Sequence, residues 1–214
     1  MQNPNTKRFW DRKNETERDN LLKSPFYLDK NKIVANYLRD TSGCLLDVGI
    51  GYGVLEKLLV ENETKLSLFG IDISARAIGT IKRSVNGEFI VASVLEIPFP
   101  NGFFDYAVAL DIFEHFRGFE LERLLKEICR VLKHKSHFIV SVPLNESRED
   151  REANRHLTSF TESSIVVLLK KYGFDIKKTI TLYAFKKWYL IKTLIAKLFK
   201  LKTPNLIVIF CKKK

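Results

Sequence analysis

Short apolar runs alternate with segments of helical periodicity along the middle of the chain. Four runs have the length and composition of buried β-strands: residues 45–48, 66–71, 88–92 and 104–111. The segment that begins at Val54 instead repeats its apolar residues every three or four positions, which is typical of a helix. Strands and helices that alternate in this way predict an open α/β sheet.

The N-terminal region predicts two helices. Residues 8–24 are charged and expected to be helical, with Phe9 and Trp10 as apolar anchors. Asp29 is expected to cap a second helix, which runs through Leu38.

The C-terminal half carries one further helix and three further strands. The polar segment from Leu144 to His156 lacks apolar periodicity, so we expect a loop there. After it, Ser159 and Glu162 form a capping pattern at the start of a helix that ends at Gly173. The expected strands are residues 137–143, 174–184 and 205–211.

The first strand is followed by a loop with a glycine at every second position. Gly49, Gly51 and Gly53 allow the backbone to turn sharply and to approach a ligand closely. A dinucleotide fingerprint needs a glycine where Val54 stands, and a phosphate loop needs a Gly-Lys-Ser/Thr sequence that does not follow. Asp47, at the end of the strand, would repel a pyrophosphate but suits a cationic group such as the ammonium of an amino acid.

The second strand ends in Asp72, about 20 residues beyond the glycines, where a carboxylate can accept hydrogen bonds from both ribose hydroxyls. Ile73 follows and offers an apolar surface to one face of a base. Together with Asp47, these residues favour a nucleoside ligand other than a dinucleotide.

Further motifs follow in order along the chain. They are D-x-G-x-G-x-G at 47–53, I-P-F-P-N-G-F-F-D at 97–105, F-E-H at 113–115 and R-V-L-K at 130–133. With the fifth strand, which ends at Pro143, this series resembles the class I S-adenosylmethionine-dependent methyltransferases. Within them it resembles the ubiquinone and menaquinone methylase branch (methyltransferase type 11), from about Ile33 to Lys178.

The resemblance implies a Rossmann-like, doubly wound sheet of seven strands in the order 3-2-1-4-5-7-6, with strand 7 antiparallel. The chain would form one methyltransferase domain with four parts: an N-terminal helical lid (1–40), a cofactor-binding core (41–184), an inserted amphipathic helix (185–204), and a last strand with a basic tail (205–214). Phe26 and Tyr27 are expected to close the site from the lid.

The resemblance also implies that the cofactor is S-adenosylmethionine, with S-adenosylhomocysteine as the product. The residues expected to bind it follow the first four strands: Asp47, Gly49, Gly51 and Gly53 at the methionine part, Asp72 at the ribose, Ile73, Ser93, Val94 and Leu95 at the adenine, and Asp111 where cofactor and acceptor meet. The family usually has an acid where Ser93 stands, and a serine hydroxyl can still accept a hydrogen bond from the adenine amino group.

Methyl transfer from a sulfonium is a direct displacement on an activated donor, so positioning and the exclusion of water matter most. If the acceptor is a hydroxyl, a base has to remove its proton. His115 and His156 are the candidates, because an imidazole titrates near neutral pH, and Asp111 is a third catalytic candidate. The alternative for Glu114 and His115 is a structural role at the start of a helix.

Some quinone and small-RNA methylases carry E-x-x-E-H as ligands of a divalent metal, and Asp111, Glu114 and His115 resemble that pattern. Two carboxylates and an imidazole suit Mg²⁺ or a transition metal. The sequence shows no clear fourth ligand, although His156 could serve, so the expectation favours no metal.

Composition and charge limit the number of domains, the cellular location and the kinds of partner that we expect. A chain of 214 residues suits one well-cored domain, and no run reaches the roughly 18–20 apolar residues that span a bilayer. The polar N-terminus lacks the apolar region of a signal peptide.

Cys44, Cys129 and Cys211 have no metal or redox spacing, which predicts buried thiols in a reducing cytoplasm. A net charge of +11 suits nucleic acid or an anionic membrane surface, and a lysine-rich genome is the equally weighted alternative.

The segment from Lys186 to Leu201 predicts an amphipathic helix. At about 100° per residue, two groups separate onto opposite faces: Trp188, Ile191, Leu194, Ile195, Leu198 and Phe199 on one, and Lys186, Lys192, Lys197 and Lys200 on the other. Such a helix can pack on the sheet, form a homodimer contact, or lie in a membrane interface.

We therefore expect a methyltransferase (EC 2.1.1.-) that acts on a small or lipid-linked acceptor, such as a quinone precursor or a sugar in surface glycan biosynthesis. It would be cytoplasmic, or peripheral at the inner membrane face. One alternative is a nucleic-acid methyltransferase, which the net charge favours. The residues at 111–114 disfavour it, because base-methylating enzymes often carry N/D-P-P-Y/F there. The other alternative is a non-catalytic module that binds S-adenosylmethionine.

Overall fold

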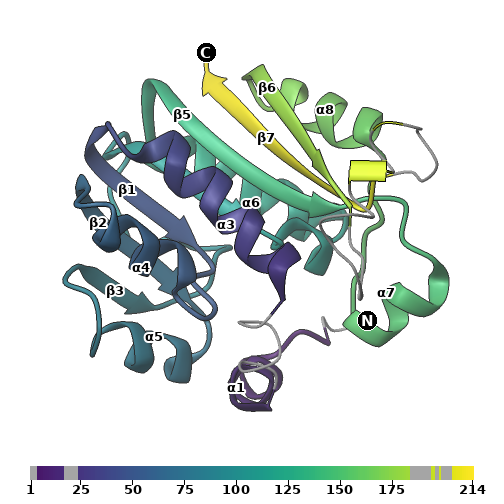
Figure 1. Ribbon diagram of the computed structural model, residues 1–214, viewed down its shortest axis with the longest axis horizontal. Helices are drawn as coiled ribbons and strands as arrows, with labels where there is room; N and C mark the ends of the chain where they lie inside the picture. The colour runs from purple at the N-terminus through teal and green to yellow at the C-terminus, as the bar shows by residue number, and fades with distance from the viewer. Residues whose placement is uncertain (1–3, 17–23, 184–193, 196–197, 199–203) are drawn as a thin grey trace.

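The computed structural model describes residues 4–16, 24–183, 194–195, 198 and 204–214. All described strands belong to one seven-stranded sheet in the order β3-β2-β1-β4-β5-β7-β6, which confirms the predicted order (Figure 1). The strands are β1 (Ser42–Val48), β2 (Lys65–Asp72), β3 (Glu88–Val91), β4 (Phe104–Leu110), β5 (Leu132–Pro143), β6 (Phe174–Leu182) and β7 (Leu206–Lys213). β1 to β5 pair in parallel, whereas β7 lies antiparallel between β5 and β6.

Helices cover both faces of the sheet because the central strands are apolar on both sides. One layer contains α3 (Pro25–Leu38), α4 (Val54–Glu61) and α5 (Ala75–Ile81), and the other contains α6 (Gly118–Val131) and α8 (Glu162–Lys171) (Figure 1). Successive residues of a strand divide between these layers. On β5, Phe138 and Val140 pack with α6 and α8, whereas Ile139 packs with α3 and α4.

Two helices lie at the carboxyl ends of the strands instead of over a sheet face. α1 (Lys7–Thr16) and α7 (Arg148–Asn154) bury none of their residues, and Figure 1 shows them beyond the arrowheads of β1 and β5. Asp11 fastens α1 to the start of α5, because its Oδ1 accepts hydrogen bonds from Ser74 Oγ at 2.7 Å and from the backbone N–H of Arg76 at 3.3 Å. α1 is therefore held over the edge where the strands end.

Two expectations for helices were wrong. α3 begins at Pro25, after Ser24, so Asp29 lies inside the helix and does not cap it. A proline is favoured at the first helical position, where its missing N–H costs nothing. The segment expected to be a loop contains α7, which is capped by Ser147. Since α7 buries no residue, it has no apolar face for hydrophobic periodicity to reveal.

The start of α8 also differs from the expectation. Thr161, and not Ser159, is the N-cap residue, and its side chain accepts a hydrogen bond from the backbone N–H of Ser164 at 3.1 Å. The hydroxyl oxygen of Ser164 in turn accepts a hydrogen bond from the backbone N–H of Thr161, which completes a capping box. The helix stops before Gly173, as predicted, where φ is 84°.

Parts of two predicted helices lie outside the described residues. These are residues 17–23 of the first helix and most of the amphipathic insertion. Within the insertion, Leu194, Ile195 and Leu198 are described, and they are helical and exposed. Among the helices described, none has the length and apolar character required to cross a membrane.

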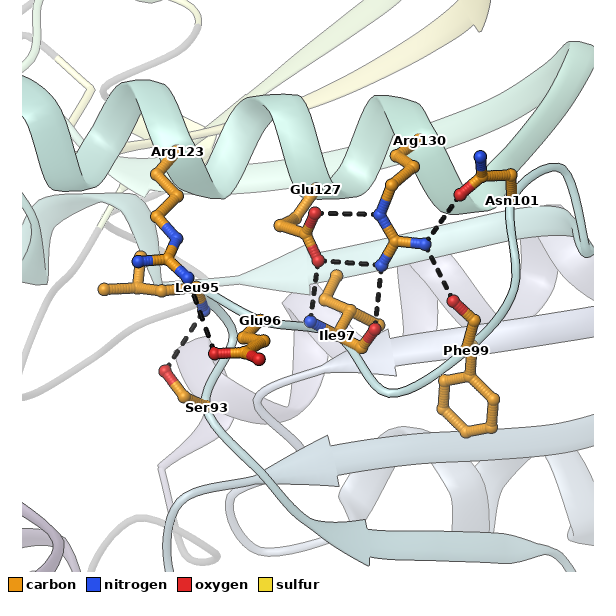
Figure 2. Close-up of polar contacts among 9 residues, drawn as sticks. All are labelled: Ser93, Leu95, Glu96, Ile97, Phe99, Asn101, Arg123, Glu127 and Arg130. Atoms are coloured by element: carbon orange, nitrogen blue, oxygen red, sulfur yellow. Dashed lines mark hydrogen bonds and ion pairs between the residues drawn. The ribbon is translucent and has the colours of Figure 1, made fainter.

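An arginine of α6 fastens the segment that connects β3 to β4. Arg130 donates hydrogen bonds to the backbone carbonyl oxygens of Ile97 and Phe99, each at 2.8 Å (Figure 2). It also pairs with Glu127, which accepts a hydrogen bond from the backbone N–H of Ile97 at 2.8 Å. This segment begins with residues 93–95, which line the large cavity at the strand ends. The first residue of the R-V-L-K motif therefore positions one wall of that cavity.

Replacing Arg130 with lysine should destabilise the protein by about 1–3 kcal/mol, because a single ammonium cannot reproduce the planar fork of donors that reaches two carbonyl oxygens and both oxygens of Glu127. Urea unfolding of the purified variant measures this change. The matched control is Arg123→Lys on the same helix, whose guanidinium contacts the exposed Glu96 at 3.5 Å and should change stability by less than about 0.5 kcal/mol. Equal stability of the two variants would contradict the assigned role of Arg130.

Candidate active site

A cavity of about 660 Å³ lies at the carboxyl ends of β1, β2 and β4. This is the edge where open parallel sheets bind ligands. Eleven of the twelve residues predicted from the sequence line it: Asp47, Gly49, Gly51, Asp72, Ile73, Ser93, Val94, Leu95, Asp111, His115 and His156. The lid residues Phe26 and Tyr27 line it as well.

The exception is Gly53, whose role is in packing. A Cβ atom on Gly53 would lie 2.4 Å from Cδ1 of Ile81, and its φ is 67°. Gly51 differs, because no heavy atom lies within 4 Å of the corresponding Cβ position. With a φ of 56°, Gly51 therefore leaves open space on the side of the cavity, which is where a ligand can approach the backbone.

Asp72 is held by backbone donors of two segments. Its Oδ1 accepts a hydrogen bond from the N–H of Ser74 at 2.8 Å, and its Oδ2 accepts one from the N–H of Gly51 at 2.9 Å. Burial raises the pKa of Asp72, while these two hydrogen bonds oppose the rise. Each carboxylate oxygen keeps a lone pair, so the group can still accept the two hydroxyls of a ribose.

Two buried acids lie together at the end of β1. Asp47 is buried, and its Oδ1 has no hydrogen-bond partner among the residues described. Glu56, from the first turn of α4, is buried beside it. Burial, followed by the nearby Glu56, raises the pKa of Asp47 well above its ordinary value, and burial raises that of Glu56 too. A cationic group such as an amino-acid ammonium would compensate both carboxyl groups, so this corner fits the methionine part of S-adenosylmethionine.

An ion pair crosses the middle of the cavity. Asp111 has a φ of 57° and pairs with the ammonium of Lys30, while Ser141 Oγ donates a hydrogen bond to its Oδ1 at 2.6 Å. Lys30 is only 2% exposed, and its Nζ lies 4.9 Å from the ring centroid of Tyr27. Burial alone would raise the pKa of Asp111, but Lys30 and Ser141 outweigh burial and hold it below the ordinary value. Asp111 is therefore ionised and neutralised by Lys30.

The 3-10 helix η1 (Phe113–His115) follows and contributes two buried polar side chains. Glu114 is 0% exposed, and neither of its carboxyl oxygens has a hydrogen-bond partner among the described residues. Burial, and then the charge of Asp111, raises the pKa of Glu114 well above its ordinary value. Burial lowers the pKa of His115 to about 3, so its imidazole is neutral at pH 7. The His115 ring packs edge-on against Trp10 of α1, with 4.7 Å between centroids.

His156 approaches the same place from the segment after α7. Its Nδ1 lies 2.7 Å and 2.8 Å from the two carboxylate oxygens of Glu146. The ring centroids of His156 and His115 are 4.8 Å apart. A ligand atom from each of Glu114, His115 and His156 lies within 4.8 Å of the others.

This grouping differs from the metal pattern considered from the sequence. Asp111 was the first member of that pattern, but its charge is already compensated by Lys30, and Ser141 donates a hydrogen bond to its other oxygen. His156, from a distant segment, instead joins Glu114 and His115. The three residues therefore form the cluster that could hold a metal ion.

Three polar residues of the site were not found from the sequence. Lys30 and Glu146 stand among other polar residues, Asp29 and Asn31 beside one and Asn145 and Ser147 beside the other, so nothing local distinguishes them. Glu56 could have been recognised from the sequence, since it is an acid on the buried side of the otherwise apolar start of α4. A buried acid close behind the glycine loop is the feature that could have identified it.

Comparison with known proteins agrees with this geometry. Residues 19–179 match the family described as a methyltransferase domain. The demethylmenaquinone methyltransferase of Thermotoga maritima is 27% identical over 178 residues, which cover 69% of this chain and 76% of that protein.

Two solved structures share the fold. One is a complex between the Haloferax volcanii Trm112 methyltransferase activator and a protein assigned as a methyltransferase, with a TM-score of 0.75, 16% identity, and coverage of 95% of this chain and 97% of the other. The second is 1,6-didemethyltoxoflavin-N1-methyltransferase of Burkholderia thailandensis with bound S-adenosylhomocysteine, with a TM-score of 0.72, 15% identity, and coverage of 97% and 87%. The family match covers most of the chain, and the strand order and the acid-lined glycine loop agree with it. The chain therefore belongs to the methyltransferase domain family and is a class I S-adenosylmethionine-dependent methyltransferase.

Proposed function

We propose that the protein transfers the methyl group of S-adenosylmethionine to a small or lipid-linked acceptor, such as a quinone precursor or a sugar in surface glycan biosynthesis. The observations that support a small acceptor are the lining and the volume of the cavity. Beyond Asp111 it continues between η1, α1 and the segment from Pro143 to His156. Its total volume of about 660 Å³ is within the range of pockets for small ligands.

Within this proposal the cofactor occupies the half of the cavity formed by the strand ends. Asp47, supported by Glu56, would bind the ammonium of the methionine part. Asp72 would accept the ribose hydroxyls, and Gly51 would allow the backbone to approach. The adenine would lie against the apolar side chains that line the adjoining wall: Ile73, Val94 and Leu95.

The transfer needs no covalent intermediate on the protein. A lone pair of the acceptor forms the new bond to the methyl carbon while the electrons of the sulfur–carbon bond return to sulfur, and a hydroxyl acceptor also loses its proton. Asp111 is already paired with Lys30. With a pKa of about 3, His115 is a weak base. His156, whose Nδ1 is fixed by Glu146, is the better oriented of the two imidazoles.

We also propose that the segment from Lys186 to Leu201 contacts an anionic membrane, where lipid-linked acceptors reside. Its alternation of lysine and apolar residues is typical of interfacial helices. The described part agrees with an exposed apolar face, since Leu194 is 59% and Leu198 67% exposed. Each lysine near an anionic surface would contribute about 1 kcal/mol.

A nucleic-acid acceptor is the alternative that the net charge of +11 favours. Binding to bulk RNA that weakens steeply as salt increases would support it, because phosphate contacts release counterions. Binding that is absent at low salt would exclude it.

Asp72→Asn should weaken the binding of S-adenosylmethionine by about 1–3 kcal/mol, or roughly 5- to 150-fold, because one charged acceptor of the ribose hydroxyls is lost. Isothermal titration calorimetry measures the affinity. Asp175→Asn, which removes an exposed acid of β6 outside the cavity, is the matched control and should bind like the wild type. If nicotinamide dinucleotides bind and S-adenosylmethionine does not, the assignment of the cavity is wrong.

Flotation with vesicles that contain phosphatidylglycerol tests the membrane contact. The wild type should float at low salt, and the double variant Leu194→Glu, Leu198→Glu should remain in solution, because two charges on the apolar face prevent its burial in the interface. Val167→Glu, a change of an equally exposed apolar residue on α8, should float like the wild type. If the wild type does not float, the lipid-linked acceptor is wrong and a free small molecule remains.

A further inference from the structure

The acceptor half of the cavity contains a buried carboxyl group without a partner. Glu114 is fully buried, lines the cavity, and makes no side-chain hydrogen bond with any described residue. Its backbone is well satisfied, because its carbonyl oxygen accepts hydrogen bonds from the N–H groups of Leu157 and Thr158 at 2.7 Å and 3.0 Å. The position of the residue is therefore fixed while its side chain is left for a ligand. Buried polar side chains in native proteins almost always have a partner.

Two imidazoles meet this carboxyl group from different segments. His115 is the next residue of η1, and His156 stands 41 residues later, after α7. Each of the three residues offers one ligand atom, and these atoms lie within 4.8 Å of one another. Ligand atoms around one metal ion, at about 2.0–2.2 Å from it, lie up to roughly 4.3 Å apart. Small rotations of these side chains would therefore bring all three to one ion.

Glu146 gives His156 the orientation of a metal ligand. Both carboxylate oxygens of Glu146 lie within 2.8 Å of Nδ1, which leaves Nε2 as the nitrogen for another partner. A carboxylate on the outer nitrogen is the usual support of a metal-bound histidine. The side chains of His156 and Glu146 are 11% and 10% exposed, so the pair is shielded from solvent.

The nearby ammonium of Lys30 does not form an ion pair with Glu114. Lys30 is directed to Asp111, whose other oxygen accepts the hydrogen bond from Ser141. None of the ion pairs among the described residues includes Glu114. The Lys30–Asp111 pair is thus complete in itself, and no described side chain supplies a hydrogen bond to the carboxyl group of Glu114.

We propose that Glu114, His115 and His156 bind a divalent transition-metal ion, with Glu146 as the outer support of His156. Two imidazole nitrogens and one carboxylate oxygen suit Mn²⁺, Fe²⁺, Co²⁺ or Zn²⁺, whereas Mg²⁺ and Ca²⁺ prefer oxygen ligands. Three protein ligands leave coordination positions open. The site lines the cavity on its acceptor side, so these positions would be accessible to the acceptor.

The consequence for the acceptor rests on the proposed methyl transfer. A divalent cation supplies a Lewis acid that lowers the pKa of an oxygen acid it binds. The site therefore points to an acceptor with a hydroxyl group. A bound ion would occupy Nε2 of His156, so in this proposal the role of metal ligand replaces the role of proton acceptor considered above for His156. The cation-binding residues themselves can be tested without knowledge of the acceptor.

Titration of the chelator-treated protein with Mn²⁺, Co²⁺ and Zn²⁺ tests the site. Calorimetry measures the binding of each ion, and the absorption spectrum reports on bound Co²⁺. The wild type should bind one equivalent. Glu114→Gln and His156→Gln should each weaken binding by more than about 100-fold, and Glu146→Gln by about 10- to 100-fold, as for other outer carboxylates. Asp150→Asn, which removes an exposed acid of the same cavity outside the cluster, should bind like the wild type.

Affinity for S-adenosylmethionine, measured on the same chelator-treated proteins, separates this site from the cofactor site. All variants should keep it, which shows that the fold and the cofactor half are intact. If the wild type binds no equivalent of Mn²⁺, Co²⁺ or Zn²⁺ while S-adenosylmethionine still binds, the metal site is wrong and the methyltransferase assignment stands. Undiminished metal binding by both Glu114→Gln and His156→Gln would equally overturn the proposal.

Discussion

The ion pair between Lys30 and Asp111 is the contact on which the arrangement of the cavity depends. Lys30 comes from α3, which covers one face of the sheet, and Asp111 follows the end of β4, so the pair joins a helix to a strand end within the cavity lining. A lysine that is 2% exposed is tolerated only with such a partner, because an unpaired buried charge is costly. The same cavity is lined by residues at the strand ends and by residues of η1 and of the segment that leads to His156.

The charge of the cavity is opposite to that of the whole chain. Formal net charge is +11, yet among the described residues seven carboxyl side chains and two lysines line the cavity. One of those lysines, Lys30, is already taken by Asp111. Burial raises the pKa of Asp47, Asp72 and Glu114. A ligand that carries positive charge stabilises the ionised forms of these acids, so the site favours such ligands. S-adenosylmethionine, with its ammonium and sulfonium groups, has this character, and so does a divalent metal ion. The excess of lysine in the composition therefore indicates the charge of the protein surface and not the charge of the ligands that the cavity favours.

The residues at the strand ends are easier to predict from the sequence than the contacts around η1 and α7, for a physical reason. Asp47, Gly51 and Asp72 each lie within a few residues of a strand end, and hydrophobic runs mark the strand ends clearly. Even there, Gly53, which we expected to bind the ligand, does not line the cavity, and a Cβ atom at its position would meet Ile81. Spacing shows that a loop needs glycines, but it does not show which neighbour each one meets.

The part of the cavity near η1 and α7 is built from contacts between residues that are distant in the chain. Lys30 meets Asp111 across 81 positions. Glu146 and His156 are ten positions apart, but they are brought together by α7, which has no apolar face and so gave no periodic signal. Polar side chains that face a cavity follow neither helical nor strand periodicity, because no core selects their spacing. The same construction explains how one fold accommodates many acceptors. The sheet fixes the cofactor half, whereas η1, α1 and α7 lie outside the sheet and can change without disturbing it.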